Sequence, residues 1–145
     1  MIDRSALLKL IPHQLGMCLL DGVQAWNNSS LHAFSDSHRR ADHPLRRGDR
    51  LSALHLCEYG AQAMAVHGGL LAARDGGRAR PGMLVSLRGV ELHCVRIDTL
   101  PDRLDVHAVL QQAGEASQQY AFRVEHAGEL LASGRAAVIL QPEQA

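Results

Sequence analysis

The sequence contains few aromatic residues, with two phenylalanines, two tyrosines and one tryptophan among its 145 residues. One hydrophobic core is expected for a chain of this length, and here leucine, valine and alanine must supply most of it. Lysine is almost absent, because Lys9 is the only one, and the formal net charge is zero. A neutral chain of this kind is not expected to be a general nucleic-acid-binding protein.

Cysteine is scarce and odd in number. Cys18, Cys57 and Cys94 each lie within an apolar run, which predicts small core residues in a reducing compartment and no disulfide framework. No uncharged apolar run reaches the length of about 18 residues that a membrane span needs. The first 14 residues lack the apolar region and cleavage site of a secretion signal. We therefore expect a cytoplasmic protein with one domain over residues 1–145.

The first half of the chain predicts short elements. A helix is expected over Arg4–Leu10, where Pro12 stops it, and a strand over Met17–Trp26. Asn27–Ser30 reads as a turn into a return strand over Leu31–Ser37. The polar segment that follows, residues 38–50, has no regular pattern.

Residues 51–73 predict the one long helix. Ser52 is a suitable N-cap, and the apolar positions that follow have helical spacing. Gly68–Gly69 is expected to weaken or end the helix. Apart from Glu58 its sides are apolar or small, as in a helix that is buried on most sides.

The rest of the chain predicts about four antiparallel strands. Residues 83–96 alternate apolar and polar residues, and the alternation slips at Arg88–Gly89, as at a β-bulge. Two further alternating runs span residues 103–112 and 117–126. Ala127–Glu129 is expected to form a hairpin turn into a last strand over residues 130–140.

This order of elements predicts an α+β chain of the hot-dog type. A strongly curved antiparallel sheet wrapped around one long helix would cover the apolar sides of that helix. A sheet with one edge left over commonly pairs with the edge of a second copy, so we expect at least a dimer.

Three stretches resemble the hot-dog 3-hydroxyacyl-[acyl-carrier-protein] dehydratases. "LIPHQLGMCLLDGV" (Leu10–Val23) resembles their opening motif, in which His13 falls at a structural position. "EYGAQAMAVHG" (Glu58–Gly68) resembles their central-helix motif, and "PGMLVSLRGVEL" resembles the strand after it. The chain looks closest to the divergent subgroup found with aryl-polyene-type pathways.

The resemblance implies a reaction and two catalytic residues. Members remove water from a 3-hydroxyacyl thioester to give a trans-2-enoyl thioester, using the helix glutamate and a histidine from the preceding loop. Glu58 matches that glutamate, and Gln62 matches the glutamine one turn later, with a role at the substrate site. His43 is the best match for the histidine, although its loop is about one residue longer and lacks the family's phenylalanine and second Pro-Gly. We expect weak activity for the isolated subunit.

Other residues remain candidates for substrate or carrier binding. His55 lies three positions before Glu58 and so shares its helix face. Arg46, Arg47 and Arg50 belong to an arginine-rich loop suited to an acidic acyl carrier protein or its phosphopantetheine phosphate. The histidines and cysteines lack the spacing of a zinc site, so no metal is expected. The resemblance implies no dissociable cofactor, because the pantetheine arm arrives with the substrate.

Two other functions are compatible with the same residues. One is a hot-dog acyl thioesterase, in which the carboxylate activates water and the product is a free acid. The other is a non-catalytic acyl-binding subunit that supports an active, related dehydratase. For the dehydratase reading, the expected partners are acyl carrier protein with its phosphopantetheine-linked acyl chain, and either a second copy or a related hot-dog subunit.

Overall fold

The computed structural model describes the chain except for residues 13, 78–79, 81 and 142–145. His13, expected to be structural, lies outside the described residues, as do parts of the polar loop before the fourth strand. Two α-helices, three short 3-10 turns and seven strands are described. They are, in chain order, β1 (Ile2–Asp3), α1 (Arg4–Leu7), η1 (Leu15–Met17), β2 (Gly22–Trp26), β3 (Ser30–Ser35), η2 (Ser37–Arg39), η3 (Ala53–His55), α2 (Leu56–Arg74), β4 (Gly82–Leu92), β5 (Leu104–Ala113), β6 (Ser117–His126) and β7 (Glu129–Leu140).

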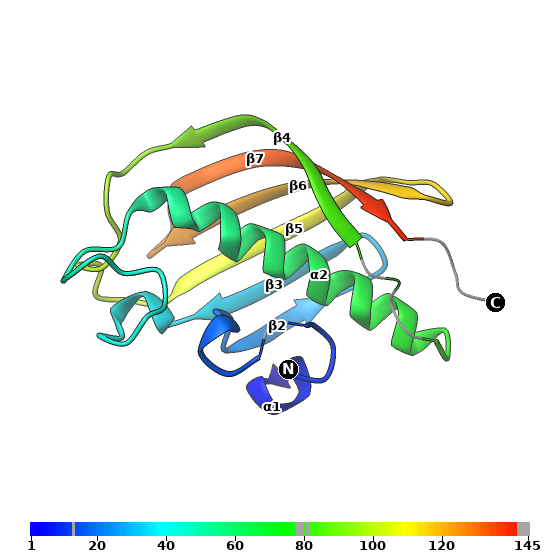
Figure 1. Cartoon of the computed structure of the whole chain (residues 1–145), viewed down its shortest axis with the longest axis horizontal. Coiled ribbons are helices and arrows are strands. Elements are labelled where there is room, and N and C mark those ends of the chain that lie inside the picture. The colour runs from blue at the N-terminus through cyan, green and yellow to red at the C-terminus, as the bar shows by residue number, and fades with distance from the viewer. Residues whose placement is uncertain (13, 78–79, 81, 142–145) are drawn as a thin grey trace.

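The strands form one antiparallel sheet in the order β1-β2-β3-β5-β6-β7-β4. The sheet curves around α2, and β4 crosses in front of β7 and β6 in Figure 1. Alternate residues of β3, β5 and β6 are buried toward the helix, as expected when one face of a sheet is covered. This arrangement confirms the predicted hot-dog fold.

Glycines let the helix and sheet approach closely. A Cβ on Gly60 of α2 would lie 2.6 Å from the ring of Phe122 in β6, and one on Gly134 of β7 would lie 2.9 Å from the same ring. The ring of Phe122 therefore fills the space that two missing side chains leave. Without it, a chain with so few aromatic residues would have a poorly filled core here.

Several predicted features are confirmed. Four antiparallel strands follow the long helix, and the register of β4 shifts between Arg88 and Glu91, where Gly89 has φ +58°. Ala127 and Gly128 both have positive φ in the turn between β6 and β7, which is the conformation of a tight hairpin.

The long helix predicted over residues 51–73 ends within one residue of the predicted span, and only the end expected at Gly68–Gly69 is wrong. α2 continues through Gly68–Gly69 and ends at Arg74. A Cβ on Gly69 would lie 2.9 Å from the carbonyl oxygen of Leu10, so this glycine allows close packing and does not cap the helix. Gly76, the residue after the C-cap Asp75, has φ +82°. This is the position at which a glycine commonly ends a helix.

Two other boundaries also differ from the predictions. The strand predicted over Met17–Trp26 begins only at Gly22, because residues 15–17 form a 3-10 turn. The first helix is one turn long and ends at Leu7. The two-residue strand β1, which pairs with β2, was not predicted.

The outer edge of the sheet is apolar and exposed. β4 pairs only with β7, and large apolar side chains lie exposed along it: Met83, Leu84, Val85, Leu87, Val90 and Leu92. Native proteins seldom leave a long apolar edge strand without protection. Neither helix in the described part of the chain is long and apolar enough to cross a membrane.

Candidate active site

The start of α2 is fixed by the segment that follows β4. The side chain of Ser52 accepts a hydrogen bond from Leu54 N (3.2 Å), so it caps the 3-10 turn that leads into the helix. Asp98 accepts the backbone N–H of Leu51 (2.9 Å), and Ile97 N donates to Leu51 O (2.9 Å). These contacts place Glu58 in the first turn of α2.

Gln62 joins Glu58 to the segment before β2. Its Nε2 donates to Glu58 Oε1 (3.1 Å) and to Met17 O (2.8 Å), and its Oε1 accepts from Leu19 N (2.8 Å). Gln62 is fully buried, whereas Glu58 is half-buried. Since both amide hydrogens of Gln62 have protein acceptors, this geometry gives it the role of orienting Glu58. Its contact with substrate stays a prediction.

His43 is buried between its own loop and α2, with only 4% of its surface exposed. Its Nδ1 accepts the backbone N–H of Leu45 (3.1 Å), and its Nε2 lies 3.1 Å from the hydroxyl of Tyr59. The candidate catalytic histidine is therefore held inside the protein by two hydrogen bonds.

The surroundings of His43 favour the neutral imidazole. Burial, and then the charges of Arg46, His55, Arg40 and His38, lower its pKa to about 4. Both desolvation and like charge disfavour the imidazolium. His43 is thus neutral at neutral pH.

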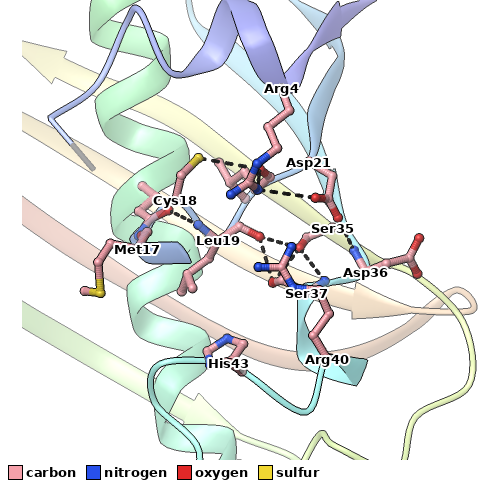
Figure 2. Close-up of polar contacts among 12 residues, drawn as sticks. Arg4, Met17, Cys18, Leu19, Asp21, Ser35, Asp36, Ser37, Arg40 and His43 are labelled. Atoms are coloured by element: carbon pink, nitrogen blue, oxygen red, sulfur yellow. Dashed lines mark hydrogen bonds and ion pairs between the residues drawn. The ribbon is translucent and has the colours of Figure 1, made fainter. Parts of the chain in front are cut away.

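Tyr59 and Ser37 extend this contact into a buried network that was not predicted from the sequence. The Tyr59 hydroxyl lies 2.6 Å from Ser37 Oγ, and Ser37 Oγ donates to Leu19 O (2.7 Å). Ser35 Oγ also donates to Leu19 O (2.5 Å). Figure 2 shows Leu19, Ser35 and Ser37 together, with His43 near them beside α2. Tyr59, the only aromatic residue of α2, was the one available signal.

The two candidate catalytic residues are therefore linked through the backbone of one residue, Leu19, whose N–H and C=O belong to consecutive peptide groups. The carbonyl of Leu19 receives the network that begins at His43, while its neighbouring N–H is bound by the side chain that also holds Glu58. Residues far apart in the sequence thus share one rigid support. Such support is what catalytic geometry requires.

The remaining candidates are His55 and three arginines of the loop that carries His43. His55, in η3, is half-buried and close enough for its charge to lower the pKa of His43. Arg46 donates to three carbonyl oxygens of its own loop, those of Arg40 (2.7 Å), Asp49 (2.9 Å) and His38 (3.1 Å). Its guanidinium therefore holds the loop together.

Arg47 and Arg50 differ from Arg46 because they are exposed. Their backbones exchange two hydrogen bonds (2.9 and 3.0 Å) across a tight turn that contains Gly48 at φ +61°. The two guanidinium groups therefore project from the tip of the loop that carries His43. Within the described residues, no group of three potential His, Cys, Asp or Glu metal ligands occurs.

Comparison with solved structures supports the fold. The ApeI:P dehydratase heterocomplex from Xenorhabdus doucetiae contains a chain with 22% identity and a TM-score of 0.85, covering 94% of this chain and 91% of that one. AziG from S. sahachiroi has 19% identity and a TM-score of 0.61, covering 86% and 92%. A hypothetical thioesterase protein with coenzyme A from Streptococcus pneumoniae TIGR4 has 8% identity and a TM-score of 0.61, covering 85% and 87%.

The family assignment comes from the sequence. No curated protein matches the chain. A family model described as ApeP dehydratase matches residues 5–145, which is nearly the whole chain. The chain therefore belongs to the ApeP-like dehydratase family.

Proposed function

We propose that this protein removes water from 3-hydroxyacyl thioesters carried by acyl carrier protein and forms trans-2-enoyl thioesters. The observation that carries the proposal is the shared support of Glu58 and His43 by the backbone N–H and C=O of Leu19. This geometry occurs in a chain of a dehydratase family.

The reaction needs two proton transfers. A base removes the proton on the carbon next to the thioester carbonyl, and the C–H electron pair forms the new double bond. The C–O bond at the next carbon breaks, and an acid protonates the departing hydroxyl, which leaves as water. We assign both transfers to Glu58, which removes the proton as a carboxylate and then, as the acid, returns it to the departing hydroxyl. His43, whose Nδ1 is occupied by Leu45 N–H, takes part as a hydrogen-bond donor through Nε2–H. No metal or dissociable cofactor is required.

Substitution of Glu58 tests the chemistry. Glu58→Gln keeps the shape and the contact with Gln62 but removes proton exchange, so turnover should fall by about a hundredfold or more. His43→Ala should have a similar effect, and a folded Glu58→Gln protein with wild-type turnover would refute the proposal. Product analysis separates the thioesterase alternative, because dehydration retains the thioester and hydrolysis releases a free acid.

We further propose that the active form pairs with a related hot-dog subunit. The exposed apolar edge of β4 supports this, since a second sheet would cover it. The structurally similar X. doucetiae chain comes from a heterocomplex of dehydratases. Two surface hollows of about 300 and 340 Å³ are lined from the sheet, and neither is lined by Glu58 or His43. A partner would supply the missing wall of the substrate site.

The partner hypothesis is tested by turnover and by mass. The chain alone should be weakly active, and a dehydratase-like protein from the same gene cluster should raise the rate. Light scattering should give at least a dimer at micromolar concentration. Full activity of a 15.8 kDa monomer that no partner changes would contradict this part of the proposal.

We propose that Arg47 and Arg50 dock the acidic carrier protein. Both are exposed on the loop that carries His43, whereas Arg46 is occupied by loop carbonyls. The double change Arg47→Glu and Arg50→Glu should weaken carrier binding, and wild-type binding should weaken as salt increases. Binding that ignores both changes would exclude this role.

A further inference from the structure

The hydrogen bonds of His43 define a single tautomer. Leu45 N–H donates to Nδ1 at 3.1 Å, and a ring nitrogen that accepts a hydrogen bond carries no proton. The proton of the neutral ring must therefore lie on Nε2, and Nε2–H donates to the hydroxyl oxygen of Tyr59 at 3.1 Å. An imidazolium would place a second N–H against that of Leu45, so the same geometry keeps the ring neutral.

The Tyr59 hydroxyl oxygen can accept the hydrogen bond from His43 Nε2–H because the hydroxyl donates its own proton to Ser37 Oγ. Ser37 Oγ lies 2.6 Å away and donates in turn to Leu19 O at 2.7 Å. Every donor from His43 to Leu19 then has an acceptor, and all point in one direction. This series of hydrogen bonds ends at the carbonyl oxygen of Leu19, which has no proton to pass on. The series therefore orients His43 and does not conduct protons.

Few other contacts would hold the imidazole in place. His43 lies in a loop that has no helix or strand between η2 and η3. Its ring does not stack on Tyr59, since the centroids are 6.2 Å apart and the planes are tilted by 32°. The hydroxyl is thus the contact by which α2 sets the orientation of the ring.

We propose that Tyr59 is a positioning residue that fixes His43 as its Nε2–H tautomer within the catalytic site. This inference rests on the proposed function, because it assigns His43 to that site. Tyr59 directly follows Glu58 on α2. Two adjacent residues of α2 therefore serve the site: Glu58 is itself catalytic, and the Tyr59 hydroxyl positions His43.

A second buried tyrosine–histidine pair provides a matched control. Tyr120 Oη lies 2.8 Å from Nδ1 of His67, whose Nε2 donates to Asn27 O at 2.9 Å. Tyr59 and Tyr120 are both almost fully buried, and both histidines are buried. Tyr59→Phe and Tyr120→Phe therefore each remove one buried hydroxyl and one tyrosine–histidine hydrogen bond.

The test combines NMR of the imidazole nitrogens with turnover of the full chain in its most active assembly. In the wild type, His43 should show a protonated Nε2 and an unprotonated Nδ1. Tyr59→Phe should shift the His43 Nε2–H signal, speed its exchange with water and lower kcat by about tenfold to a hundredfold. Tyr120→Phe should alter the signals of His67 alone and leave turnover unchanged.

A second variant protects the test against loss of folding. Ser37→Ala keeps the Tyr59 ring and removes the acceptor of its hydroxyl, so the His43 signals should move in the same direction by a smaller amount. Wild-type His43 signals in both variants would overturn the inference, as would unchanged kcat in Tyr59→Phe. If the signals change as expected but no protein dehydrates the thioester, the proposed function fails while the positioning of His43 by Tyr59 stands.

Discussion

Acid should destabilise this protein through histidines that are buried in the neutral form. The pKa of His43 falls to about 4 in the folded chain, from an ordinary value of 6.5. As pH falls, the unfolded chain therefore takes up a proton before the folded chain does. The stability that His43 contributes is complete above the unfolded pKa and is lost as pH falls toward the folded value.

The loss from His43 alone is large enough to measure. Between about pH 7 and about pH 5, the difference in proton binding amounts to about 2 kcal/mol. Burial also lowers the pKa of His38 and of His67, so both add to the loss in the same direction. The wild-type free energy of unfolding should therefore decrease steeply over this interval.

Urea unfolding across this pH range measures the effect. His43→Gln keeps a donor and an acceptor but no titrating group, so its profile should be flatter by about 2 kcal/mol. Val66→Ala, a buried change on α2 without a titrating group, should lower the whole curve without changing its slope. Equal slopes for wild type and His43→Gln would refute the argument that His43 is held neutral.

Two further substitutions test the packing of α2 against the sheet and the effect of charge within the sheet. Gly60→Ala places a Cβ 2.6 Å from the ring of Phe122 and should cost about 1 to 3 kcal/mol of stability; Phe122→Leu in the same chain should recover part of this in urea unfolding, and a neutral Gly60→Ala would contradict the close contact. Arg88 and Arg135 are register partners on β4 and β7, and like charges directly opposite destabilise a sheet, so Arg88→Glu should add about 0.5 kcal/mol. That gain should shrink at high salt, and a gain independent of salt would point to another cause.

The fold could be predicted because its signals are local. The alternation of the late strands, the slip at Gly89 and the apolar sides of the long helix each depend on neighbouring residues. The errors occurred where a distant contact decides the outcome. Gly68–Gly69 reads as a helix end, yet Gly69 is needed because the carbonyl of Leu10 packs against it. The sequence of the helix does not indicate that Leu10 packs against Gly69.

The candidate site depends even more on contacts between residues that are far apart in the sequence. Gln62 lies one turn from Glu58, so a hydrogen bond between them could have been expected from helix geometry. Its other partners are Met17 O and the N–H of Leu19, the latter 43 positions earlier in the chain, and these contacts exist only once the segment before β2 packs on α2. His43 is connected to the C=O of Leu19 through Tyr59 and Ser37. A motif can thus identify the two candidate catalytic residues, but the support that holds them is backbone from a third segment. Leu19 lies within the opening motif Leu10–Val23, yet every residue has a backbone N–H and C=O, so the motif does not reveal that those of Leu19 have this role. A change that shifts the backbone of Leu19 should disturb Glu58 and His43 together.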